Sequence, residues 1–178
     1  MEVVKRVGRH LVQKGHVLDF YEDDIQLPDG RVVQWDFLKH KGAAAVIAVR
    51  DDGKLLMVRQ YRNTADRQTL EIPAGSRDSL TEPTLATASR ELEEETGYHS
   101  DHLDLLLTLR TAIAYCDEFI DVYVATDLVP TKQHLDEDEF LDVEAYTMEE
   151  LEKKIFSREI EDTKTISALL AYKVKYQK

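Results

Sequence analysis

One stretch of this chain, EPTLATASRELEEETGY at residues 82–98, predicts a helix that gathers carboxylates on one face. Glu91, Glu94 and Glu95 stand at positions i, i+3 and i+4, so their side chains project in nearly the same direction. Like charges placed in this way repel one another and destabilise an isolated helix. A hard divalent cation would offset that repulsion, because Mg²⁺ takes oxygen ligands and is typically held by one or two carboxylates together with substrate phosphates.

Neighbouring residues set the limits of this helix. Pro83 suits a first helical turn, and Gly97 fits the left-handed position that commonly follows the last turn. Upstream, residues 70–72 (Leu-Glu-Ile) read as a short strand that runs into residues 73–75 (Pro-Ala-Gly). The predicted order is therefore strand, tight loop, helix.

The same residues resemble the signature of the Nudix hydrolase family, G-x5-E-x7-R-E-U-x-E-E-x-G-U, in which U is a bulky apolar residue. From Glu82 to Tyr98 the match is complete. The family glycine corresponds to Gly75, which makes the loop at residues 76–81 one residue longer than the signature. The resemblance implies an α/β fold, the Nudix α/β/α sandwich with a mixed sheet, and an ion pair in which Arg90 and Glu82 hold the loop against the helix.

The resemblance also implies a metal site. Glu91 and Glu95 would be direct ligands, and the carbonyl oxygen of Ala74 would complete the inner shell. Glu94 would be a further ligand or would support catalysis through water. The implied cofactor is Mg²⁺, for which Mn²⁺ could substitute.

Two features resemble the ADP-ribose pyrophosphatases and nucleoside diphosphate sugar hydrolases of the family. Residues 58–62 (VRQYR) resemble a strand from which Arg62 would bind a phosphate or the terminal ribose with its forked guanidinium. The N-terminal strands resemble a dimerising segment, in which the single tryptophan, Trp35, would stack on adenine. A surface charge for Arg62 and a core position for Trp35 are the competing interpretations. The substrate-binding candidates are Trp35, Asp36, Arg59, Arg62 and Glu71.

The acidic loop LDEDEF at residues 135–140 resembles the loop from which these enzymes draw a catalytic glutamate. Alignment on Phe140 makes Glu139 the first candidate to orient or deprotonate the attacking water, and Glu137 the second. A solvated acidic loop is the alternative. Residues 113–114 (Ile-Ala) stand where adenosine-directed members usually carry proline and glycine, so a broader range that includes GDP-mannose fits as well.

The remaining sequence predicts two parts. Residues 1–41 read as a small antiparallel β element around the turn signal at residues 28–30 (Pro-Asp-Gly). Such an element is too small to be stable alone, so it would pack on the main domain or on a second subunit of a homodimer. Residues 42–178 would form the Nudix domain. Its predicted strands cover residues 43–49, 54–60, 103–110, 118–125 and 140–146, and its C-terminal helices begin at Thr147 and Asp162.

Composition limits the partners and the compartment. A net charge of −12 argues against nucleic acid or an anionic membrane as the main partner, because both need a basic face. The single cysteine, Cys116, cannot form an internal disulfide and favours a reducing cytoplasm. No apolar run is long enough to cross a bilayer.

Together these features predict a Mg²⁺-dependent pyrophosphatase that cleaves ADP-ribose to AMP and ribose 5-phosphate, or acts on related nucleotide sugars. Hydrolysis of dinucleoside polyphosphates or nucleoside triphosphates is an alternative, and so is RNA decapping, which would favour a basic surface. A non-catalytic nucleotide-sugar sensor is a third alternative. Such sensors tend to lose signature glutamates, which this chain retains.

Overall fold

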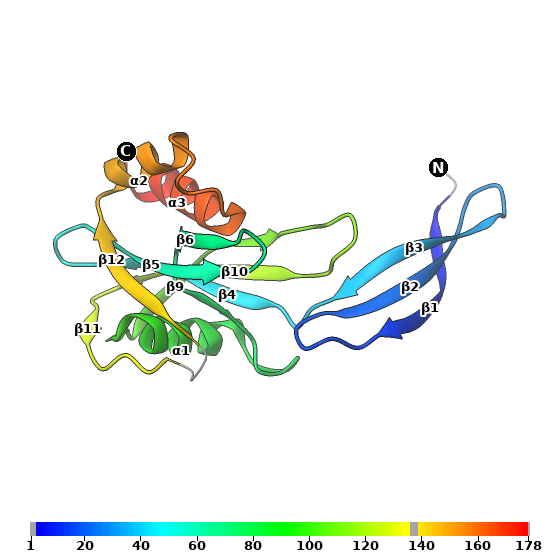
Figure 1. The fold of residues 1–178 in the computed structure, drawn as a ribbon, viewed down its shortest axis with the longest axis horizontal. Coiled ribbons are helices and arrows are strands. Elements are labelled where there is room, and N and C mark those ends of the chain that lie inside the picture. The colour runs from blue at the N-terminus through cyan, green and yellow to red at the C-terminus, as the bar shows by residue number, and fades with distance from the viewer. Residues whose placement is uncertain (1–2, 136–138, 178) are drawn as a thin grey trace. The chain divides into compact units, whose positions relative to one another are not determined.

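The computed structural model describes residues 3–135 and 139–177, which form two compact units (Figure 1). The first unit runs to Gly42 and also includes Arg110–Phe119. The second comprises Ala43–Leu109 and the residues from Ile120 onward.

A three-stranded antiparallel sheet forms the first unit, from β1 (Lys5–Gln13), β2 (Asp19–Gln26) and β3 (Val32–Lys39), with β2 in the middle. Gly30 takes a φ of 87° in the predicted turn between β2 and β3, a conformation that glycine adopts without steric cost. Residues 110–119 belong to this unit through main-chain hydrogen bonds. The Leu38 N–H donates to the Tyr115 carbonyl (2.7 Å), and the Asp117 N–H donates to the Leu38 carbonyl (3.1 Å).

The second unit contains a seven-stranded sheet. Its strands are β4 (Ala43–Val49), β5 (Leu55–Arg62), β6 (Arg67–Glu71), β7 (Ala74–Ser76), β9 (His102–Arg110), β10 (Phe119–Thr126) and β12 (Leu141–Tyr146). The order is β12-β5-β4-β10-β9, with β6 paired to β5 and β7 paired to β4. The sheet is mixed, because β4 runs parallel to β10 and antiparallel to β5 and β7. A separate short ladder joins β8 (Tyr98–His99) to β11 (Val129–Pro130).

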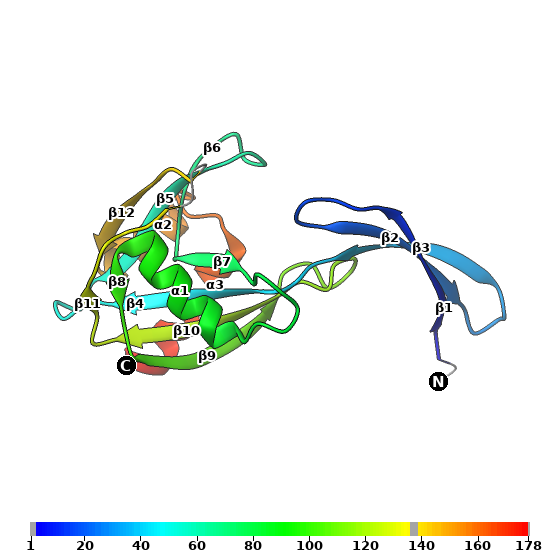
Figure 2. The same cartoon turned by 90° about the horizontal axis from the view of Figure 1, so that it is seen from below.

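Helices cover both faces of this sheet (Figure 1 and Figure 2). The helix α1 (Thr84–Thr96) lies on one face, and α2 (Met148–Phe156) and α3 (Thr163–Tyr176) lie on the other. Alternate side chains of β4 enter the two cores: Ile47 packs with α2 and α3, and Val46 packs with α1. Burial on both faces explains the unbroken apolar run of β4. The predicted α/β fold with a mixed sheet between helices is confirmed.

The helices begin and end at or next to the predicted signals; Pro83 is the extended residue just before α1 rather than part of its first turn. Gly97 follows α1 in the left-handed conformation, with φ 69°. Thr147 and Glu150 form a capping box at the start of α2. The Asp162 carboxylate accepts the Thr165 N–H at 2.9 Å and caps α3.

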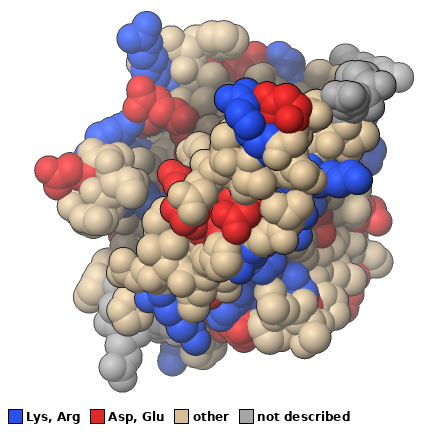
Figure 3. Space-filling view, turned by 90° about the vertical axis from the view of Figure 1, so that its right-hand side faces the viewer, with Lys and Arg blue, Asp and Glu red and all other residues tan. Residues whose placement is uncertain are grey.

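The surface carries charge of both signs. Figure 3 shows Lys and Arg side chains interspersed with Asp and Glu on the face that it displays. Within the described residues, no helix is long and apolar enough to cross a membrane.

Candidate active site

The turn between β6 and α1 brings the main chain close to two buried carboxylates. The Ala74 N–H donates a hydrogen bond to Glu95 Oε2 at 2.9 Å. A Cβ added to Gly75 would lie 2.0 Å from Glu91 Oε1, so only glycine lets this carboxylate approach β7 so closely. The signature spacing would place its glycine at position 76, where this chain has serine. The close approach of Glu91 gives a physical reason for a glycine one residue earlier, at Gly75.

Glu91 and Glu95 are costly to ionise where they lie. Only 8% of Glu91 and 3% of Glu95 is exposed. Burial raises the pKa of Glu91 to about 7, although Arg90 opposes the rise. Burial also raises the pKa of Glu95 to about 8, against the hydrogen bond from Ala74 and with the Glu91 charge adding to the rise. A cation bound beside these two carboxyl groups would therefore stabilise their ionised forms.

Arg90 supplies positive charge at the edge of this pair. Its Nη1 donates to Glu91 Oε1 at 2.7 Å and to Glu94 Oε2 at 2.9 Å. The predicted ion pair with Glu82 is present but longer, at 3.7 Å between Arg90 Nε and Glu82 Oε1. That Nε is buried and has no hydrogen-bond partner among the residues that the structure describes. Arg90 therefore links the loop to the helix and also orients two of the candidate metal ligands.

The donor set fits a hard divalent cation that shares its ligands with a substrate. Among the described residues, no three His, Cys, Asp or Glu side chains are grouped so that they could hold a metal by themselves. Mg²⁺, however, is commonly bound by one or two carboxylates, and phosphate and water oxygens complete its shell. The Glu91 and Glu95 carboxylates beside the Ala74 main chain meet that requirement, and the more exposed Glu94 lies at the rim.

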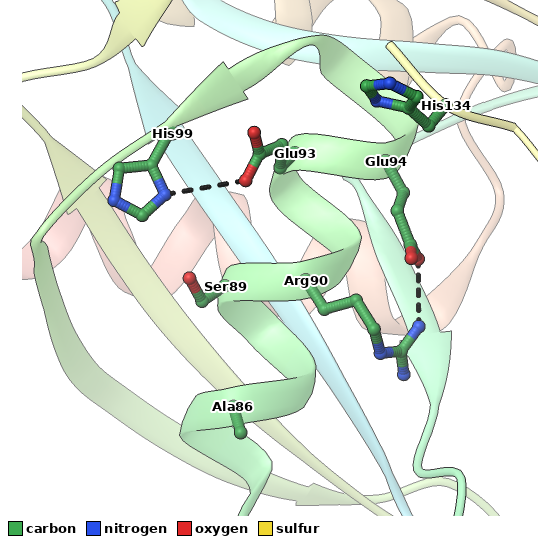
Figure 4. A pocket seen from close by; sticks show the side chains of 7 residues that line it. All are labelled: Ala86, Ser89, Arg90, Glu93, Glu94, His99 and His134. Carbon is green, nitrogen blue, oxygen red and sulfur yellow. Dashed lines mark hydrogen bonds and ion pairs between the residues drawn. The ribbon is translucent and has the colours of Figure 1, made fainter. Parts of the chain in front are cut away.

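A hollow of about 560 Å³ adjoins this rim on the outer side of α1 (Figure 4). Arg90 and Glu94 line it and form an ion pair with each other at 2.9 Å. On its other side His99 pairs with Glu93 at 3.7 Å. The residues that line the hollow are Ala86, Ser89, Arg90, Glu93, Glu94, His99 and His134.

Arg62 and Glu71 form a second charged group next to the buried pair. Arg62 Nε and Nη2 donate to the two Glu71 oxygens at 2.8 and 2.7 Å. Burial raises the pKa of Glu71, but its bonds to Arg62 and Lys164 outweigh that effect and hold the pKa at about 2. The Glu95 charge contributes to a raised pKa of Arg62, which places the two groups within electrostatic reach. The sequence singled out Arg62 and Glu71 but missed Lys164.

Glu139 lies near the same carboxylates. Its charge raises the pKa of both Glu91 and Glu95, although its own side chain is exposed. Glu137, the second candidate for the attacking water, lies outside the described residues. The structure thus brings Glu139 together with the candidate metal ligands.

Three further sequence candidates lie on β5 and β3. Arg59 stands three residues before Arg62 on β5, so the two side chains leave opposite faces of the strand. Its Nε donates to Glu144 at 2.5 Å. Trp35 and Asp36 are exposed on β3 of the first unit, and Trp35 is 52% accessible, which excludes a buried core position within this chain. Binding of substrate by these three residues stays a prediction.

Comparison with known proteins identifies the same family as the motif at residues 82–98. The model of the NUDIX domain matches residues 39–168. The ADP-ribose pyrophosphatase of Bacillus subtilis is 40% identical, over 97% of this chain and 91% of its own length. The methanol dehydrogenase activator of Bacillus methanolicus is 37% identical over 93% of this chain and 90% of its own. The ADP-ribose pyrophosphatase of Mycobacterium tuberculosis is 32% identical over 93% and 81%.

The fold is shared with a solved structure. The crystal structure of an ADP compounds hydrolase superposes with a TM-score of 0.84 over 96% of this chain and 92% of that one. The sequence identity is 21%, so this similarity concerns the fold alone.

Proposed function

This chain belongs to the NUDIX family, and we propose that it is a pyrophosphatase that hydrolyses ADP-ribose to AMP and ribose 5-phosphate. The family resemblance of residues 82–98 is confirmed. One observation carries the proposal: Ala74, whose N–H donates to the buried Glu95, follows only three residues after Glu71, the carboxylate that binds Arg62, so the two charged pairs lie close together. A cation on the first pair and the guanidinium on the second would together bind a diphosphate. The two similar ADP-ribose pyrophosphatases support this choice of substrate.

The metal ligands in this proposal are Glu91, Glu95 and the Ala74 carbonyl oxygen, with Glu94 as a further ligand or a support through water. The family relationship implies a divalent metal, and we assign Mg²⁺, with Mn²⁺ as a substitute. When bound, the ion would neutralise phosphate oxygens and lower the pKa of bound water. The protein holds the carboxylates in place beforehand, because the Ala74 N–H fixes Glu95 and Arg90 fixes Glu91.

Arg62 binds the phosphate or the terminal ribose, since Glu71 occupies only two of its five N–H donors. Glu139 orients the attacking water and accepts its proton, with Glu137 as the second candidate. Water adds to one phosphorus, the bond to the bridging oxygen breaks, and two phosphate monoesters leave. Arg59 is retained as a substrate-binding candidate on the basis of the sequence resemblance alone.

We further propose a homodimer, in which Trp35 and Asp36 contribute to the partner's site. Exposed apolar residues on β1 and β3 support this arrangement, because a second subunit would remove part of this apolar surface from water. They include Val7, Leu11, Val32 and Trp35. The net charge of −12 supports the view that neither nucleic acid nor membrane is a partner, and the single cysteine supports a cytoplasmic location.

A hydrolysis screen tests the proposal. ADP-ribose, GDP-mannose, UDP-glucose, a dinucleoside tetraphosphate and a deoxynucleoside triphosphate are compared with Mg²⁺ and with Mn²⁺, and the nucleotide products are separated by chromatography. We expect ADP-ribose to give the highest kcat/KM. Equal turnover of several nucleotide sugars would indicate a broad specificity, in keeping with the exposed Ile113 of the altered loop. Cleavage of the triphosphate or tetraphosphate alone would refute the proposal.

A further inference from the structure

Lys164 occupies an unfavourable position for a lysine. It lies in the first turn of α3, one residue after the helix starts at Thr163, where the helix dipole repels positive charge. Its side chain is only 11% exposed, although lysine is rarely buried unless it is paired. A compensating interaction is therefore required, and two carboxylates supply it.

The first of these carboxylates is Glu71, to which Lys164 Nζ donates a hydrogen bond. The second is Asp162, whose Oδ2 lies 3.0 Å from the same Nζ. Glu71 also accepts from Thr69 Oγ1 at 2.7 Å and from both nitrogens of the Arg62 fork. Arg62 and Lys164 therefore share one buried acid: Arg62 donates to both of its oxygens, and Lys164 donates to Oε2.

The start of α3 is also attached to the end of β6. The buried Thr165 hydroxyl oxygen accepts the Ile72 N–H at 3.1 Å, one residue after Glu71 in the strand direction. This bond keeps the start of α3, and with it the main chain of Lys164, next to the strand end that carries Glu71. Such an attachment suits a residue that must hold another in a fixed geometry.

The charges of this cluster cancel. Glu71 and Asp162 contribute two negative charges, and Arg62 and Lys164 contribute two positive charges. Without Lys164 the cluster would carry a net negative charge at Glu71, three residues before Ala74, whose N–H binds Glu95. An anionic diphosphate would then meet additional repulsion at the place where Arg62 has to bind it.

We propose that Lys164 is a positioning residue for substrate binding: it neutralises the buried Glu71, so that Glu71 orients the Arg62 guanidinium toward a diphosphate without adding net negative charge to the site. The inference rests on the proposed function, because it assigns Arg62 to the substrate. It adds a residue 93 positions away from Glu71 in sequence to the binding site.

The test compares Lys164→Met with Lys173→Met. Lys173 lies on the same helix and pairs with Glu152 at 2.6 Å, so its substitution removes the same charge from α3 at a site outside the cluster. For Lys164→Met we expect KM for ADP-ribose to rise roughly tenfold while kcat changes less than about threefold, because the lost interaction acts on binding. Lys164→Arg keeps the charge and should restore KM to within about threefold of the wild type.

A substitution at Glu71 separates this role from a structural one. In a Glu71→Gln background the acid that Lys164 neutralises is gone, so Lys164→Met should raise KM by a much smaller factor. Equal effects of Lys164→Met in both backgrounds, or a KM equal to that of Lys173→Met, would overturn the proposal. Calorimetric binding of ADP-ribose is measured in parallel. A wild type that binds but does not cleave would refute the proposed function, and its Kd series would still decide the role of Lys164.

Discussion

Gly75→Ala tests whether the close approach of Glu91 to the loop is required for activity. The added methyl group would lie 2.0 Å from Glu91 Oε1 and 2.4 Å from Oε2, whereas ordinary contact begins at 3.4 Å. Gly75 does not have a positive φ, so the backbone itself tolerates alanine. The carboxylate would have to retreat by about 1.4 Å to reach that contact distance.

A displacement of this size is large for a metal ligand. Misplacement of a reacting group by about 1 Å can lower the rate by about 100-fold, which corresponds to about 2.7 kcal/mol of transition-state stabilisation. Because Glu91 is buried and bonded to Arg90, it has little room to adjust. We expect kcat/KM for ADP-ribose to fall by about 100-fold in Gly75→Ala, with weaker binding of Mg²⁺ in calorimetry.

Gly53→Ala is the matched control. Gly53 has a φ of 78°, and apart from its two chain neighbours no described residue has an atom within 4 Å of an added Cβ, so alanine there strains the backbone without meeting other side chains. Both variants should lose stability, by about 1–3 kcal/mol, but only Gly75→Ala should lose activity. Steady-state hydrolysis and thermal melting measure the two effects separately. A Gly75→Ala enzyme with kcat/KM within threefold of the wild type would refute the reasoning.

Three further predictions concern charge and stacking. Glu95→Gln should lower kcat by more than about 100-fold, because it removes a charged metal ligand. The melting temperature of the metal-free protein should stay unchanged or rise, because the amide keeps the side-chain volume and removes a buried acid. Near-normal kcat at saturating Mg²⁺ would contradict this. Metal-free protein should lose stability as pH rises from about 4.5 to about 8, because folded Glu95 keeps a proton that the unfolded chain releases. Melting curves should therefore show greater stabilisation by Mg²⁺ at pH 8.5 than at pH 6, and a pH-independent shift would exclude this linkage. Trp35→Ala should raise KM for ADP-ribose roughly tenfold if the ring stacks on adenine, and an unchanged KM would remove Trp35 from the site.

Local signals in the sequence are sufficient to predict much of the secondary structure of the second unit. The helix α1 could be placed because its limits depend on neighbouring residues, Pro83 and the left-handed Gly97. The strand β4 could be placed because burial on both faces leaves an unbroken apolar run. The direction of the Glu91 and Glu95 side chains followed from helical spacing alone. In each case the physical cause lies within a few residues of its effect.

Contacts between distant segments left no such signal. Residues 110–119 belong to the first unit because main-chain groups of Leu38 form hydrogen bonds with them. The order of apolar and polar side chains does not indicate which main-chain groups bond to each other. Arg59 and Arg62 were grouped together by their resemblance to a family strand, yet strand alternation already implied that they face opposite sides. The period of the strand was the better guide to which arginine meets Glu71.

Lys164 shows what kind of signal was overlooked. A lysine one residue into a helix that begins with an aspartate cap opposes the helix dipole, so the sequence already contained a local inconsistency. Such inconsistencies persist where a tertiary interaction compensates for them, and functional sites are common places for that compensation. Glu71 is the compensating group here, and it connects the end of a strand to the start of the last helix. The sequence alone could mark Lys164 as unusual, but only the fold identifies its partner, because the pairing depends on how β6 and α3 meet.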